Sequence, residues 1–109
     1  MAFKLANVDG QSVLVSGDHY YDLATISDGN VSSDPSAAIY SLDAISELYA
    51  KLDRFEPSGS LENTKMGAPI TGSRNCFAVG LNYRNHAKES GMEIPPFPMI
   101  FTKHTSCIT

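Results

Sequence analysis

The 109-residue sequence lacks a basic cluster, a long apolar run and an apolar leader, and each absence argues against a class of protein. A net charge of −4, with no grouping of lysine and arginine, argues against binding to nucleic acid or to an anionic membrane surface. No apolar run approaches the ~20 residues that span a bilayer. The first residues include Lys4 and Asp9 instead of the apolar core of a signal peptide. We therefore expect a cytoplasmic protein with no nucleic-acid or membrane partner.

Cysteine is also scarce, since Cys76 and Cys107 are the two in the sequence. Neither has a neighbouring cysteine, histidine or acidic residue at the spacing of a zinc site. Free thiols in a reducing compartment are therefore favoured over a disulfide. Hydrophobic residues make up 42% of the chain and charged residues 18%, a balance that can build a hydrophobic core.

The first 23 residues predict a small antiparallel meander. Residues 2–8 and 11–16 alternate apolar and polar side chains on either side of Asp9-Gly10. Asp-Gly between two alternating runs is typical of a hairpin with a type I′ turn, because both residues can adopt positive φ. A third short strand is expected at residues 19–23, in which His19 is assigned a structural role.

One amphipathic helix is expected at residues 42–53, after a loop at 27–37. Ser41 is placed to cap this helix, and Asp43 in its first turn suits the helix dipole. The apolar side chains recur at intervals of three and four, which predicts a helix that covers the meander. They are Leu42, Ile45, Leu48, Tyr49 and Leu52.

Glycine and proline in residues 57–73 indicate a linker, and we place a domain boundary there, between 1–72 and 73–109. A short apolar run at 75–79 predicts a strand buried on both faces. About two turns of helix are expected at 83–90, ended by Gly91. Three prolines exclude helix from 93–98, and residues 99–104 are a further strand candidate.

Two groups of residues in the second half could carry chemistry. His86 and Glu89 are three positions apart on the expected helix, so a carboxylate could orient the imidazole as a general base. By spacing alone, a solvated ion pair on a helix surface remains the simpler interpretation. Lys103 with Thr105 and Ser106 could receive a carboxylate, or could simply be the solvated end of a strand.

The combined pattern is more specific than its parts. Within residues 68–103, a strand is followed by this ordered set: Gly80-x-Asn82-Tyr83-x-x-His86-x-x-Glu89, prolines, and Phe101-x-Lys103. The pattern resembles the fumarylacetoacetate hydrolase family, strongly from residue 68 onward and loosely before it. The resemblance implies an α+β fold. The small antiparallel β meander and its helix would be followed by the first strands and the lid helix of a mixed β-roll catalytic domain that is incomplete here.

The resemblance also implies a function. His86 and Glu89 would form a catalytic dyad that deprotonates a water or moves a proton beside a divalent metal, magnesium or manganese. Family members act on 2-oxo and 1,3-diketo acids by carbon–carbon bond hydrolysis, isomerisation or decarboxylation in aromatic-compound breakdown. A homodimer is expected. The implied substrate contacts are Asn82, Tyr83, Lys103, Thr105 and Ser106.

The sequence departs from the family pattern in two ways. His104 stands where the family usually has proline, and no carboxylate follows Lys103, so the family's Glu-x-Glu and later aspartate metal ligands are missing. We therefore expect no metal bound by this chain alone. The chain would be the inactive N-terminal part of an enzyme, whether a truncated product, a fragment or one piece of an assembly. The alternative is a non-catalytic binding or assembly module from the same family, which pairs through exposed strand edges.

Overall fold

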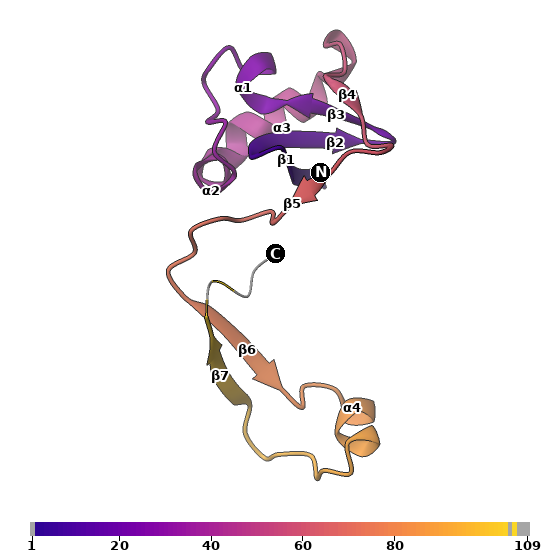
Figure 1. Cartoon of the computed structure of the whole chain (residues 1–109), viewed down its shortest axis with the longest axis vertical. Coiled ribbons are helices and arrows are strands. Elements are labelled where there is room, and N and C mark those ends of the chain that lie inside the picture. The colour runs from indigo at the N-terminus through magenta and orange to yellow at the C-terminus, as the bar shows by residue number, and fades with distance from the viewer. Residues whose placement is uncertain (1, 105, 107–109) are drawn as a thin grey trace. The chain divides into compact units, whose positions relative to one another are not determined.

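The computed structural model describes residues 2–104 and 106. The chain divides into two compact units, one ending at Gly72 and the next beginning at Ser73 (Figure 1). Each unit has its own antiparallel sheet. No helix in the described residues is long and apolar enough to cross a membrane.

The N-terminal unit is built on a five-stranded antiparallel sheet in the order β4-β3-β2-β1-β5. Its centre is the predicted meander, which the structure confirms. Asp9 and Gly10 have φ values of 51° and 82°, the positive values that a type I′ hairpin turn requires. The strands are β1 (Lys4–Val8), β2 (Gln11–Ser16), β3 (His19–Asp22), β4 (Gly59–Ser60) and β5 (Met66–Gly67).

The two edge strands come from the passage that the sequence indicated to be a linker. Gly59 pairs with Tyr20, and Gly67 pairs with Asn7. A Cβ atom at Gly59 would lie 2.6 Å from the Tyr20 hydroxyl oxygen, and one at Gly67 would lie 3.0 Å from Asn7 Nδ2. These glycines therefore permit close approach between strands, a requirement that composition alone cannot distinguish from chain flexibility.

Two short helices that the sequence did not predict begin at aspartates. Asp22 Oδ1 accepts a hydrogen bond from the Thr25 N–H at 3.1 Å, and Asp34 Oδ1 accepts one from the Ser36 N–H at 3.2 Å. Both aspartates are therefore N-caps, and the expected third strand ends one residue before Leu23. The helices are α1 (Leu23–Ile26), α2 (Pro35–Ala38), the 3₁₀ turn η1 (Ile39–Ser41), α3 (Leu42–Ala50) and the 3₁₀ turn η2 (Leu52–Arg54).

The predicted amphipathic helix is present as α3 and η2, with Lys51 between them at φ −120° and ψ 27°. The predicted cap is wrong, because the Ser41 side chain makes no capping hydrogen bond where η1 runs directly into α3. The predicted apolar face is confirmed at Ile45, Leu48 and Leu52, which are buried, whereas Leu42 is 50% exposed.

The hydrophobic core of this unit lies between the sheet and α3, which crosses the sheet in Figure 1. Strand, helix and loop all contribute to it, so the unit has the α+β architecture that was predicted. Phe3 and Tyr49 add an aromatic contact beside the core, with ring centroids 6.2 Å apart. The buried cluster is Leu14, Leu23, Val31, Ala38, Ile45, Leu48 and Leu52.

The second unit consists of β6 (Cys76–Gly80), α4 (Arg84–Glu89) and β7 (Met99–Lys103), with β6 and β7 paired antiparallel. The expected burial of the first strand on both faces is wrong for the described residues. Phe77 is 63% exposed, and Ile100 on the same face is 65% exposed. A two-stranded ribbon has no second layer to cover its faces, and such ribbons are marginally stable by themselves.

Candidate active site

The candidate site begins at a strained turn at the end of β6. Leu81 has φ +50°, a left-handed conformation that is rare for a residue with a branched side chain. The strain lies between Gly80 and Asn82, inside the pattern that carries the family resemblance. Backbone strain of this kind concentrates at functional sites. Here it turns the chain sharply from β6 toward α4, with Asn82 and Tyr83 exposed along the connection.

Helix α4 presents the two predicted catalytic residues on one side. His86 and Glu89 are three positions apart and both are exposed, whereas Ala87 between them is fully buried. The buried methyl group fixes which face of the short helix points inward. His86 and Glu89 therefore both lie on the solvent side of α4, the shared face that their spacing predicted.

The end of α4 is tightly defined. The Met92 N–H donates to the Ala87 carbonyl oxygen at 2.9 Å, and the Gly91 N–H donates to the Lys88 carbonyl oxygen at 3.1 Å. These two bonds form a Schellman motif, with Gly91 at φ +67° in the position that favours glycine. The predicted stop at Gly91 is confirmed, and it fixes the last turn, which carries Glu89.

The dyad geometry is incomplete in one respect. In the described part of the chain, every hydrogen bond that involves a side chain lies between Asn7 and Thr71, in the N-terminal unit. None therefore joins His86 to Glu89. The two side chains are exposed on one face of α4 and share no hydrogen bond, so the described structure shows neither the dyad bond nor the solvated ion pair.

Lys103 lies at the other end of the hairpin from α4. It pairs with Cys76, whereas Met99 pairs with Gly80 next to the turn. Lys103 lies four positions after Met99, which is roughly 14 Å along the strand. The Lys103 ammonium lies over the Phe101 ring, 5.6 Å from its centroid. Ser106 is exposed, and the predicted contact at Thr105 lies outside the described residues.

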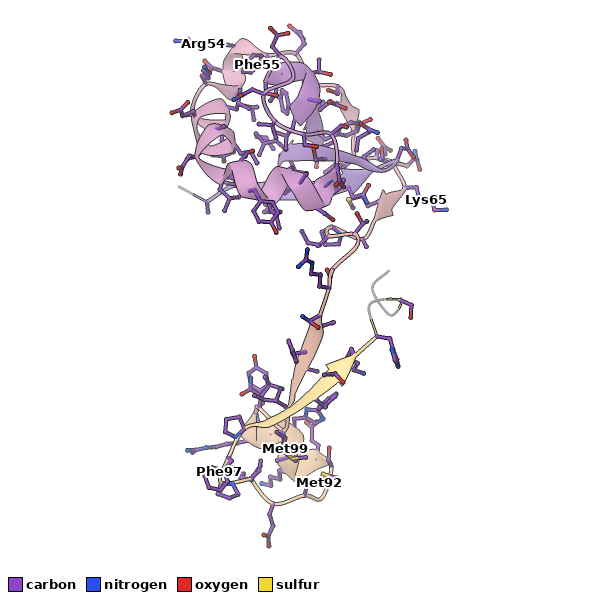
Figure 2. All side chains as sticks on the ribbon, turned by 90° about the vertical axis from the view of Figure 1, so that its left-hand side faces the viewer. Arg54, Phe55, Lys65, Met92, Phe97 and Met99 are labelled. Carbon is purple, nitrogen blue, oxygen red and sulfur yellow. The ribbon has the colours of Figure 1, made fainter. Side chains whose placement is uncertain are left out.

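A hollow of about 250 Å³ lies beside Asn82, and sequence reasoning did not anticipate it. The end of β6 forms one wall and the proline-rich segment forms the other. Figure 2 shows Phe97 at the end of this unit where α4 lies, together with Met92 and Met99. The clustering of prolines with Ile94 and Phe97 was the available signal. The lining residues are Val79, Gly80, Leu81, Asn82, Ile94, Pro95, Pro96, Phe97 and Pro98.

The residues present do not fit a metal site. Within residues 2–104 and at 106, no group of three or more histidine, cysteine, aspartate or glutamate side chains is placed to hold an ion. His86 offers a nitrogen donor and Glu89 a single carboxylate, whereas hard cations such as magnesium are held by oxygen ligands.

Three comparisons with known proteins and families show what this chain is similar to. Oxaloacetate tautomerase YisK of Bacillus subtilis (strain 168) is 47% identical over 53 residues, which is 46% of this chain and 18% of that protein. A fumarylacetoacetate hydrolase domain-containing protein 2 homolog of Dictyostelium discoideum is 42% identical over 48 residues, 44% of this chain and 15% of that protein. No family model matches the sequence.

A crystal structure described as that of an HpcE protein from Mycobacterium smegmatis aligns with 94% of this chain, at a TM-score of 0.75 and 37% identity. The strand–turn–helix–strand site thus sits on a fold shared with longer proteins. The chain belongs to the fumarylacetoacetate hydrolase family. It spans 15% and 18% of these two curated relatives and 36% of the solved protein.

Proposed function

We propose that this chain is the N-terminal part of a fumarylacetoacetate hydrolase-family enzyme that acts on a 2-oxo or 1,3-diketo acid. The observation that carries the proposal is α4, which holds His86 and Glu89 on one exposed face, one turn apart. The relative named oxaloacetate tautomerase supports an oxo acid as the substrate. In aromatic-compound breakdown, the reaction would be hydrolysis, isomerisation or decarboxylation.

In this proposal, Glu89 orients the His86 imidazole, which accepts a proton from a water or from the substrate carbon. The two side chains share no hydrogen bond in the described structure, so they would first have to come within hydrogen-bond distance of each other. Asn82 and Tyr83 would hold the substrate at the exposed turn. Lys103 would attract its carboxylate as a point charge, with Thr105 and Ser106 as hydroxyl donors.

The complete enzyme would also need the family's carboxylate metal ligands. A magnesium or manganese ion would have to be held by residues beyond these 109, since the described residues offer no cage. Metal-dependent turnover by the isolated chain is therefore expected to be absent.

A chimera tests the proposal. Residues 1–109 replace the matching N-terminal part of the Mycobacterium smegmatis protein, which aligns with 94% of this chain. Turnover of a panel of oxo acids that includes oxaloacetate is then followed with magnesium or manganese. We expect turnover by the chimera and a loss of at least about a hundredfold in His86→Ala and Glu89→Gln. Lys88→Gln, on the same helix, is the matched control.

An active chimera that keeps full turnover in both dyad variants contradicts the catalytic roles assigned to His86 and Glu89.

The second candidate function is the non-catalytic assembly module, and one observation favours it. The apolar side chains of the β6–β7 hairpin, Phe77 and Ile100 among them, are exposed in the described structure, as a contact surface for a second chain would be. A chimera without turnover, together with self-association of the 109-residue chain, supports that candidate.

A further inference from the structure

The β6–β7 pairing places small side chains opposite large ones on one face. Gly80 pairs with Met99, Ala78 with Phe101, and Cys76 with Lys103. Directly opposed residues of antiparallel strands point to the same face of the sheet. This face therefore has open space along β6 into which the longer side chains of β7 can extend.

The Phe101 ring uses that space. Its Cε1 atom lies 3.1 Å from the position that a Cβ at Gly80 would occupy, so the ring reaches diagonally across the ribbon toward the turn before Asn82. The Lys103 ammonium lies 5.6 Å from the centroid of the same ring. One aromatic side chain thus touches the glycine at the α4 end of the hairpin and the lysine at the other end.

We propose that Phe101 is a positioning residue, whose ring draws the Lys103 ammonium back along β7 toward the end of the hairpin where Asn82 and His86 lie. This inference rests on the proposed function, in which Lys103 attracts the substrate carboxylate. The strand itself carries Lys103 away from that end, because Met99 and Lys103 are roughly 14 Å apart along β7. A cation over a ring face is held by the ring quadrupole, so the ring redirects the charge.

Gly80 contributes to the same arrangement of Phe101 and Lys103. Any side chain at this position would meet the ring at 3.1 Å, closer than ordinary van der Waals contact. The ring would then have to shift by a few tenths of an ångström, which weakens its contact with the lysine. Gly80 is therefore assigned to the placement of Lys103 as well as to the end of β6.

The first test measures the contact itself in the 109-residue chain. Lysines are ¹³C-dimethylated, which keeps their charge, and Lys103→Arg identifies the Lys103 methyl signal. We expect that signal to be shifted upfield by the ring current in the native chain and in Phe101→Tyr. The shift should vanish in Phe101→Leu and decrease in Gly80→Ala. The other four lysines serve as internal references. An unshifted native signal, or a shift that survives in Phe101→Leu, overturns the proposal.

The second test measures the consequence in the chimera. Phe101→Leu is expected to raise KM about two- to fivefold with little change in kcat, the loss that an exposed cation–π contact predicts, and Phe101→Tyr should restore it. An equal fall in kcat without rescue by tyrosine contradicts a positioning role. If Lys103→Gln leaves KM unchanged while the ring-current shift is present, the proposed role of Lys103 fails and the contact stands. If Lys103→Gln raises KM and the shift is absent, the positioning role alone fails.

Discussion

Asn7 donates from its side-chain Nδ2 to the carbonyl oxygen of Ala68 at 2.9 Å, across 61 positions of sequence. Its Oδ1 accepts a hydrogen bond from the Gly10 N–H at 2.8 Å, and the side chain is 5% exposed. The buried side-chain amide of Asn7 therefore hydrogen-bonds both the first hairpin turn and the residue that follows β5, and so holds them against β1.

Asn7→Ala should lower the free energy of unfolding of the N-terminal unit by about 1–3 kcal/mol, because the Ala68 carbonyl and the Gly10 N–H lose their partner. Urea denaturation followed by tyrosine fluorescence measures the change. The matched control is Asn30→Ala, an exposed asparagine of the same unit, expected to stay within about 0.5 kcal/mol of the native chain. Equal effects of the two variants would contradict the role given to Asn7.

Helix capping in the N-terminal unit gives a second prediction. Asp34→Ala should cost about 1 kcal/mol of stability, because the Ser36 N–H loses its capping acceptor. Ser41→Ala should be close to neutral, since the Ser41 side chain caps nothing. The comparison is made by thermal and urea unfolding of the two variants. A larger loss for Ser41→Ala than for Asp34→Ala would show that the capping assignment is wrong.

The end of α4 gives a third prediction. Gly91→Ala forces a side chain into positive φ at a cost of roughly 1–2 kcal/mol, so the Schellman bonds should open more often. Hydrogen exchange of the backbone N–H groups of residue 91 and Met92 should then accelerate by about tenfold. Ser90→Ala, at φ −80°, is the control and should leave exchange unchanged. Unchanged exchange in Gly91→Ala would mean that the motif does not hold the helix end.

The exposed face of the second hairpin gives a fourth prediction. We expect the purified 109-residue chain to self-associate, because Phe77 and Ile100 are 63% and 65% exposed on one face. Phe77→Ser combined with Ile100→Ser should shift the sedimentation profile toward monomer. The control is Leu42→Ser, an exposed leucine of the N-terminal unit. A native chain that is monomeric at high concentration would rule out association through this face.

Short sequence patterns predicted the turns and helix boundaries that depend on neighbouring residues. Asp9-Gly10 predicted the first hairpin, and the spacing of Ile45, Leu48 and Leu52 predicted the helix that covers the sheet. Gly91 predicted the end of α4, where only a residue tolerant of positive φ fits without strain. In each case, the physical reason acts within a few residues of chain.

The parts that the sequence did not predict depend on distant partners. Gly59 and Gly67 resemble linker glycines until Tyr20 and Asn7 are seen against them. The hollow beside Asn82 likewise needs two segments that meet in space. The positive φ of Leu81 has no sequence signal at all, because leucine is an unfavourable residue for that conformation.

Part of the geometry of the candidate site was predictable from the sequence, whereas the catalytic and binding roles of its residues stay predictions. His86 and Glu89 share a face of α4, which follows from their spacing. The placement of Lys103 at the opposite end of the ribbon from α4 does not follow from the order of the pattern, because it depends on the β6–β7 register. Short sequence distance to a motif is therefore a poor guide to distance in space across a hairpin.

The edge strands of the N-terminal sheet also set an order of events during synthesis. β4 and β5 are supplied by residues 59–60 and 66–67, which leave the ribosome after every other strand and helix of that unit. Until they emerge, β3 and β1 are open edges and the Asn7 amide has no Ala68 to bind. The nascent unit therefore reaches its native sheet only when Ala68 has left the exit tunnel, close to the point where the second unit begins.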